Sequence, residues 1–113
     1  MAQLSLETTI TGGVTAIALS GELDIAGAGL VEREVARLGG GPGDALVIDL
    51  RDVAFMDSSG LRVLALTARR VEDRGGRFAL VAGAAQVMRV FDVTRMRERF
   101  TFVADPAEVT GAP

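Results

Sequence analysis

The sequence predicts an α/β fold in which amphipathic helices pack on a mixed β-sheet of about four to five strands. Segments typical of strands alternate with segments that carry apolar residues at helical spacing, in the order strand, strand, helix, strand, helix, strand, helix, strand. Strands that alternate with helices need crossover connections, which place parallel strands side by side and helices on the faces of the sheet.

The first elements along the chain are expected to form a β-hairpin and then a helix. Residues 4–10 and 14–19 alternate between apolar and polar side chains, and the turn sequence Gly12-Gly13 lies between them. From Asp24 onward the apolar residues follow a helical period. They form one face of the predicted helix, made of Ala28, Val31, Val35 and Leu38.

The second half of the fold begins after a glycine-rich connection, 39–43, which ends the first helix. The nearly continuous apolar run 45–50 is typical of a parallel strand that is covered on both faces. A second helix is expected over 58–73, with a core face of Leu61, Leu64, Ala68 and Val71. A strand, a third helix and a last short strand follow, at 77–81, 87–94 and 100–103.

The length and composition predict one domain, 1–113, with an ordered core of about 4–105 and a frayed tail, 109–113. The chain contains no Cys and no His, so thiol chemistry is excluded and the commonest general base and metal ligand are missing. We therefore expect no enzyme activity, no catalytic residue, no bound metal and no cofactor.

The charge pattern and the apolar runs limit the partners. The net charge is -3 with no basic stripe, which argues against direct nucleic-acid binding. The first residues lack the pattern of a signal peptide, and no apolar run reaches the length of a membrane span. We expect no membrane association and a cytoplasmic location.

The segment from Val53 to Leu61 is the candidate site, because an apolar stretch ends in small polar residues where a helix begins. Asp57 or Ser58 can cap this helix by accepting a hydrogen bond from a free backbone N–H, and a cap without any further role is one interpretation. The other interpretation is a switch controlled by phosphorylation of Ser58. A phosphate on Ser58 would meet unpaired N–H groups and the positive end of the helix dipole, and Asp57 would oppose the added charge.

Four motifs carry a resemblance to a known family, and the third is the specific one. They are Gly21-Glu22-Leu23-Asp24, Val47-Ile48-Asp49-Leu50, Phe55-Met56-Asp57-Ser58-Ser59-Gly60-Leu61 and Val90-Phe91-Asp92-Val93-Thr94. With these motifs the chain, from about Leu4 to Val103, resembles the STAS family and in particular the small bacterial anti-sigma-factor antagonists.

The resemblance implies a binding protein controlled by phosphorylation of Ser58, which matches the first serine of the family's Asp-Ser-Ser-Gly-Leu motif. The unphosphorylated form would bind an anti-sigma factor that is also a serine kinase, and would thereby release a sigma factor. Phosphorylation would switch this binding off, and a metal-dependent serine phosphatase would reset it. The expected partner-binding residues are Asp24, Asp57, Ser58, Ser59, Gly60, Arg62 and Leu66.

Two other functions stay open, and one motif departs from the family. The chain could be a STAS interaction module of a stress-signalling complex or a transporter, or a small anion or nucleotide binder at the Ser58 turn. Thr94-Arg95-Met96 stands where the family often carries Thr-Gly-Leu. We expect the missing glycine to change the geometry of that helix end.

Overall fold

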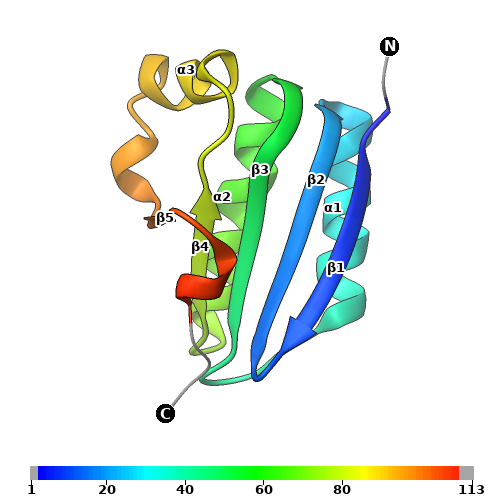
Figure 1. Ribbon diagram of the computed structural model, residues 1–113, viewed down its shortest axis with the longest axis vertical. Helices are drawn as coiled ribbons and strands as arrows, with labels where there is room; N and C mark the ends of the chain where they lie inside the picture. Colours follow the sequence, from blue (N-terminus) through cyan, green and yellow to red (C-terminus); the bar gives the residue numbers. More distant parts are fainter. Residues whose placement is uncertain (1–2, 110–113) are drawn as a thin grey trace.

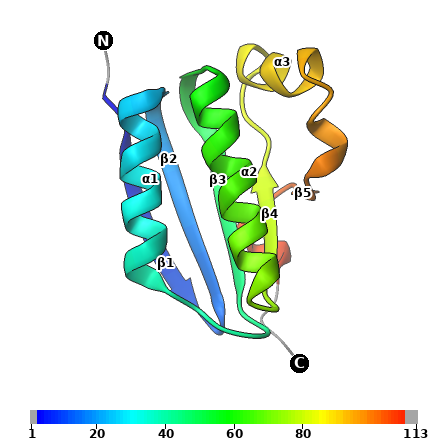
Figure 2. The ribbon, with the colours of Figure 1, turned by 180° about the vertical axis from the view of Figure 1, so that it is seen from behind.

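The computed structural model describes residues 3–109 and shows a five-stranded mixed sheet with two long helices on one face (Figures 1 and 2). The strands stand in the order in which they occur in the chain: β1 (Ser5–Thr11), β2 (Val14–Leu23), β3 (Ala45–Met56), β4 (Arg77–Val81) and β5 (Phe102–Val103). Strand β1 is antiparallel to β2, and the later pairings are parallel. The predicted fold class is confirmed.

The helices connect the parallel strands, as the crossover argument requires. They are α1 (Ile25–Leu38), α2 (Ser58–Asp73) and α3 (Ala85–Val93), with the short 3-10 helices η1 (Arg97–Arg99) and η2 (Pro106–Glu108). Figure 2 shows α1 and α2 lying along the same face of the sheet. Within residues 3–109, no helix is both long and apolar enough to cross a lipid bilayer.

Strand β3 is buried on both faces over its first half, as the apolar run predicted. Leu46 and Ile48 face the large core between the sheet and the helices. Ala45 and Val47 face a second, smaller cluster on the opposite side. The strand is longer than predicted, because it continues beyond residue 50 and ends at Met56.

The core faces of the two long helices match the predicted periodicity. Val31 and Val35 of α1 are buried, and Ala28 and Leu38 pack against the same core. On α2 the predicted core residues Leu61, Leu64, Ala68 and Val71 are all buried. Most of the stability of these helices therefore comes from apolar burial against the sheet.

The last strand is shorter than predicted, because only Phe102 and Val103 belong to it. Phe100 instead ends η1, and its ring packs edge-on against the ring of Phe91, with 5.4 Å between centroids. Val109, assigned from the sequence to a frayed tail, packs with Val103 against the smaller cluster. The rest of that predicted tail, 110–113, lies outside the described residues.

The end of α3 keeps a left-handed residue without the expected glycine. Arg95 has φ 58° and, among residues 3–109, is the one non-glycine residue with a positive φ. The Met96 N–H donates to the carbonyl of Phe91 at 2.8 Å, and the Arg95 N–H donates to that of Asp92 at 3.2 Å. These bonds cap the helix end in the way that a glycine normally allows, so an arginine takes the strained position.

Candidate functional site

The sheet topology brings the starts of α1 and α2 to one edge of the molecule. Leu23 at the end of β2 pairs with Met56 at the end of β3, and the two strands are parallel. Asp24 and Asp57 follow these paired residues, so they occupy equivalent positions. The Asp57 N–H donates to the Leu23 carbonyl at 3.4 Å, which holds the two turns together. Two motifs that are distant in the sequence are thus neighbours in the fold.

The cap of α2 is Asp57, which decides between the two capping residues that the sequence allowed. One carboxylate oxygen, Oδ1, accepts hydrogen bonds from the N–H of Ser59 at 2.9 Å and of Gly60 at 3.3 Å. Ser58 is the first helical residue and is exposed. Its hydroxyl makes no hydrogen bond to any residue within 3–109. The hydroxyl is therefore free to react or to contact a partner.

Gly60 lies in the same turn but is buried, so it contributes close packing rather than surface. A Cβ atom at this position would lie 2.6 Å from the Leu23 carbonyl oxygen and 2.7 Å from Cγ of Met56. Only glycine lets the first turn of α2 approach the end of β2 this closely. Ser59, between Gly60 and Ser58, is partly exposed.

Asp24 caps α1 in the same manner. Its carboxylate accepts a hydrogen bond from the Gly27 N–H at 3.0 Å. Within the described part of the chain, no hydrogen bond or ion pair joins Asp24 to Ser58 or to Asp57. Asp24 is thus near the candidate switch through the pairing of the strands, while its carboxylate is engaged by its own helix.

The exposed face of α2 carries the other predicted contact residues in a line. Ser58, Arg62 and Leu66 are spaced four residues apart, which places them on neighbouring turns of one helix face. Arg62 is exposed, and its side chain forms no ion pair or hydrogen bond within residues 3–109. Leu66 exposes 42% of its surface. The structure therefore presents a hydroxyl, a cation and an apolar side chain along one surface.

Two exposed apolar residues beside the site were not predicted. Ile25, the first residue of α1, is 76% exposed, and Phe55, two residues before Asp57, is 48% exposed. Phe55 follows an irregularity in the pairing of β2 with β3, where Gly21 pairs with Val53 and Glu22 with Phe55. Strict alternation from the buried Val53 therefore does not indicate that Phe55 is exposed. An apolar surface flanking a free serine is suited to binding another protein.

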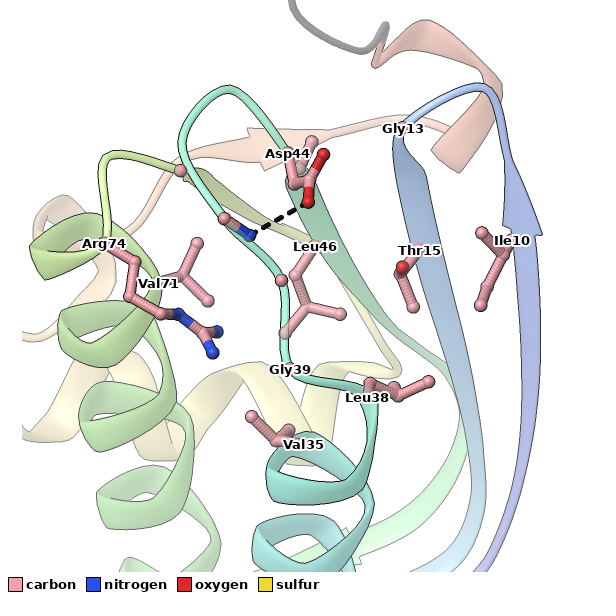
Figure 3. Close-up of a pocket in the computed structure, with 14 residues that line it drawn as sticks. Ile10, Gly13, Thr15, Val35, Leu38, Gly39, Asp44, Leu46, Val71 and Arg74 are labelled. Atoms are coloured by element: carbon pink, nitrogen blue, oxygen red, sulfur yellow. Dashed lines mark hydrogen bonds between the residues drawn. The ribbon is translucent and has the colours of Figure 1, made fainter.

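A cavity of about 250 Å³ lies away from this site, at the edge where α1 and α2 end (Figure 3). Its wall includes residues 39–41 of the glycine-rich connection between α1 and β3. The Asp44 carboxylate accepts a hydrogen bond from the Gly41 N–H at 2.9 Å and so holds this segment in place. The cavity contains none of the predicted partner-binding residues.

Comparison with known proteins agrees with the fold. The STAS domain model matches residues 5–109. The chain is 32% identical over 80 residues to the anti-sigma-B factor antagonist of Bacillus subtilis, covering 71% of this chain and 72% of that protein. It is 30% identical over 88 residues to the anti-sigma-F factor antagonist RsfB of Mycobacterium tuberculosis, covering 78% of this chain and 71% of the relative.

The solved structures give the same result. The crystal structure of an anti-sigma factor antagonist from Mycobacterium paratuberculosis superposes with a TM-score of 0.80 at 28% sequence identity, covering 94% of this chain and 90% of the other. A second structure, of an anti-sigma factor antagonist from Thermotoga maritima described as putative, reaches a TM-score of 0.78 at 25% identity and covers 91% and 89%. From the family model, the curated relatives and the shared architecture, the chain belongs to the STAS domain family.

Proposed function

We propose that this protein is an anti-sigma-factor antagonist whose unphosphorylated form binds an anti-sigma factor and whose binding is switched off by phosphorylation of Ser58. The observation that carries the proposal is the free, exposed hydroxyl of Ser58 on a helix start that Asp57 already caps. The names of the curated relatives, which are anti-sigma factor antagonists, support it.

In this proposal the protein itself catalyses no reaction and acts in the cytoplasm. The anti-sigma factor is also an ATP-dependent serine kinase that phosphorylates Ser58, and binding of the antagonist releases a sigma factor. A metal-dependent serine phosphatase removes the phosphate and restores binding. These roles follow from the family resemblance, and the exposed Ser58 gives both enzymes an accessible substrate.

The geometry suggests how a phosphate would act without refolding the protein. Phosphorylation adds a charge of about -1.5 to -2 beside the Asp57 carboxylate, at a residue whose hydroxyl has no bond to lose. The exposed Ile25 and Phe55 side chains would be desolvated in a complex, and burying a dianion among them carries a large desolvation cost. The phosphate would therefore weaken binding directly, at the interface.

The modification is tested by mixing the chain with the anti-sigma factor from its own genome, with and without ATP, and by measuring intact mass and phosphopeptides. We expect one phosphate, on Ser58. Ser58→Ala should stay unmodified and still bind. The matched control, Ser59→Ala, should be modified like the wild type. Phosphate found only on Ser59 or on a threonine would contradict the assignment.

The switch is tested by calorimetry and by amide NMR spectra of both forms of the protein in the same buffer. We expect phosphorylation to weaken partner binding at least tenfold, or about 1.4 kcal/mol. The chemical shift changes should be confined to Asp24 and to residues 56–62. Unchanged affinity would remove the switch, and changes spread through β4 and β5 would indicate a conformational mechanism instead.

A further inference from the structure

A groove with arginine side chains on its walls runs between α2 and η1. Its volume is about 360 Å³. We call it the arginine groove and define it by five of its lining residues, Arg62, Leu66, Arg69, Arg99 and Phe100. Figure 2 shows α2 facing outward on the helical side of the sheet, with η1, in orange, on the same flank as β4. The groove combines two elements that are far apart in the sequence.

The charge of the groove is unbalanced. Arg62, Arg69 and Arg99 are exposed, and none of their side chains forms an ion pair or a hydrogen bond with the part of the chain that the structure describes. Three arginines outside the groove do form ion pairs, Arg37 with Glu34, Arg51 with Asp49 and Arg97 with Asp92, whereas Arg33 on α1 has no side-chain partner within the described residues. The groove wall includes one acidic residue, Glu72. A local positive surface thus exists on a protein whose net charge is -3.

The lining of the groove also includes apolar residues. Leu66 is 42% exposed, and Phe100 is partly buried with its ring packed on the core. Apolar residues together with arginines are typical of protein interfaces, and the guanidinium of arginine pairs with carboxylates through two parallel bonds. The ligand that matches both features is an acidic protein segment with an apolar side chain.

We propose that the arginine groove binds an acidic segment of the protein partner, and that this segment inserts at least one apolar side chain beside Leu66. The identity of the partner rests on the proposed function, because Arg62 lies one helical turn after Ser58 and so joins the groove to the switch surface.

The same spacing couples the groove to phosphorylation. A phosphate on Ser58 would lie four residues before Arg62, where an anion and a cation on a helix attract each other. The phosphate would draw Arg62 away from the acidic segment. Phosphorylation thereby adds a repulsive charge and removes one attractive charge from the groove.

The groove is tested first with a defined probe, a synthetic peptide in which glutamates flank leucines, titrated into the full chain by calorimetry and amide NMR. We expect shifts in residues of the arginine groove and a Kd that weakens with added salt. Arg69→Glu and Arg99→Glu should each weaken binding about tenfold or more, since close charge pairs are lost and repulsion is added.

The matched control is Arg33→Glu, which makes the same charge change on the exposed face of α1, away from the groove. It should alter the Kd less than about twofold, the size expected for screened charges at a distance. A peptide with glutamines in place of glutamates should not bind. The proposal would be overturned if the acidic peptide did not bind, or if Arg33→Glu lost as much affinity for it as Arg69→Glu and Arg99→Glu. Equally tight binding of single-stranded RNA would also overturn the proposal, because it would indicate a general anion surface.

A second measurement separates this inference from the proposed function. If the cognate anti-sigma factor binds the wild type and Arg69→Glu equally well, the proposed role of the arginine groove is wrong and the proposed function stands. If the acidic peptide binds in the arginine groove but no anti-sigma factor binds the chain, the proposed function is wrong and the groove remains a binding site for acidic segments. Circular dichroism of each variant should match the wild type, because the substituted side chains are exposed.

Discussion

The first turns of α1 and α2 share one backbone arrangement and differ in the side chain that they present. Asp24 has φ -109° and ψ -164°, and Asp57 has φ -114° and ψ -170°. Each carboxylate accepts a hydrogen bond from a buried glycine three residues later. The residue directly after each aspartate is exposed, and it is Ile25 on α1 and Ser58 on α2. The aspartate caps are thus common to both helices, whereas the serine distinguishes the candidate switch.

The glycines of the two turns should show the largest effect on stability. Gly60→Ala should lower the free energy of unfolding by about 1–3 kcal/mol, because the new methyl would overlap the Leu23 carbonyl and Met56. Gly27→Ala should cost less, since a Cβ there has one contact closer than 3.0 Å, to the Glu22 carbonyl oxygen.

Urea unfolding measures both substitutions. The control is Gly29→Ala on α1, where the nearest atom to a Cβ is the end of the Arg33 side chain at 3.8 Å. This variant should be more stable than the wild type by about 0.5–1 kcal/mol, from better helix propensity. Equal stability of Gly60→Ala and Gly29→Ala would show that the close approach of α2 to β2 is not needed.

Removal of either aspartate cap should have the next largest effect. Asp57→Ala should lower the free energy of unfolding by about 1 kcal/mol, and Asp24→Ala should have a similar or slightly smaller effect because its carboxylate accepts one bond rather than two. Asp57→Asn keeps a capping oxygen and should be close to the wild type. An Asp57→Ala variant as stable as the wild type would mean that solvent caps this helix equally well.

The third helix extends the comparison, because its cap residue offers no side-chain acceptor. Ala84 has extended backbone angles and makes no side-chain cap bond. Ala84→Ser should supply this bond and raise the free energy of unfolding by about 0.5–1 kcal/mol. Ala85→Ser, one residue later, adds the same hydroxyl inside the helix and should give no gain in thermal unfolding. A gain in both variants would indicate that the hydroxyl acts in some other way.

The two long helices also differ in one anchor to the sheet, which should be visible in the acid range. Hydrogen bonds from Arg37 and then Thr8 lower the pKa of Glu34 from 4.5 to about 2, so this carboxylate ties α1 to β1. A lowered pKa stabilises the fold above the unfolded value and loses this effect as the pH falls from about 4.5 to about 2.

Glu34→Gln should therefore cost about 0.5 kcal/mol at neutral pH, a value reduced by solvent screening, and nothing near pH 2. Glu32→Gln removes the same charge from an exposed α1 residue whose side chain makes no hydrogen bond or ion pair within residues 3–109, and should have no such profile. Parallel profiles of the two variants in urea unfolding at several pH values would contradict the anchor.

The smallest effect is expected at Ser58 itself. Ser58→Ala should change the free energy of unfolding by less than about 0.5 kcal/mol, because the hydroxyl makes no bond within the described residues and Asp57 holds the cap. Thermal unfolding and partner binding should thus separate in this variant. A loss of 1 kcal/mol or more would show that the serine is structural.

Much of the fold could be predicted because its signals are local. The bounds of α2 and β4 agree with the predicted ranges, since apolar periodicity and flanking glycines mark them. The last strand was overestimated, because the ring of Phe100 packs against Phe91 and the backbone leaves the sheet at that residue. Arg95 could not be foreseen in a left-handed conformation, because the helix end is set by hydrogen bonds to Phe91 and Asp92.

The candidate site was predicted in part. The predicted partner-binding residues Ser58, Arg62 and Leu66 are exposed on α2. The prediction missed Ile25 and Phe55, which are apolar and yet exposed. Whether an apolar side chain is covered depends on which elements pack over it, and a single strand or helix does not carry that information.

The sequence by itself determined where helices and strands alternate, that Asp57 or Ser58 can cap the second helix, and that no cysteine or histidine chemistry is available. These features depend on residues close together in the chain. Only the tertiary structure decided that Gly60 must lie against Leu23, that the starts of α1 and α2 share one edge, and that Arg99 joins Arg62 and Arg69 around one groove. The physical reason is that burial and pairing arise between residues distant in sequence, whose separation is set by sheet register and helix packing.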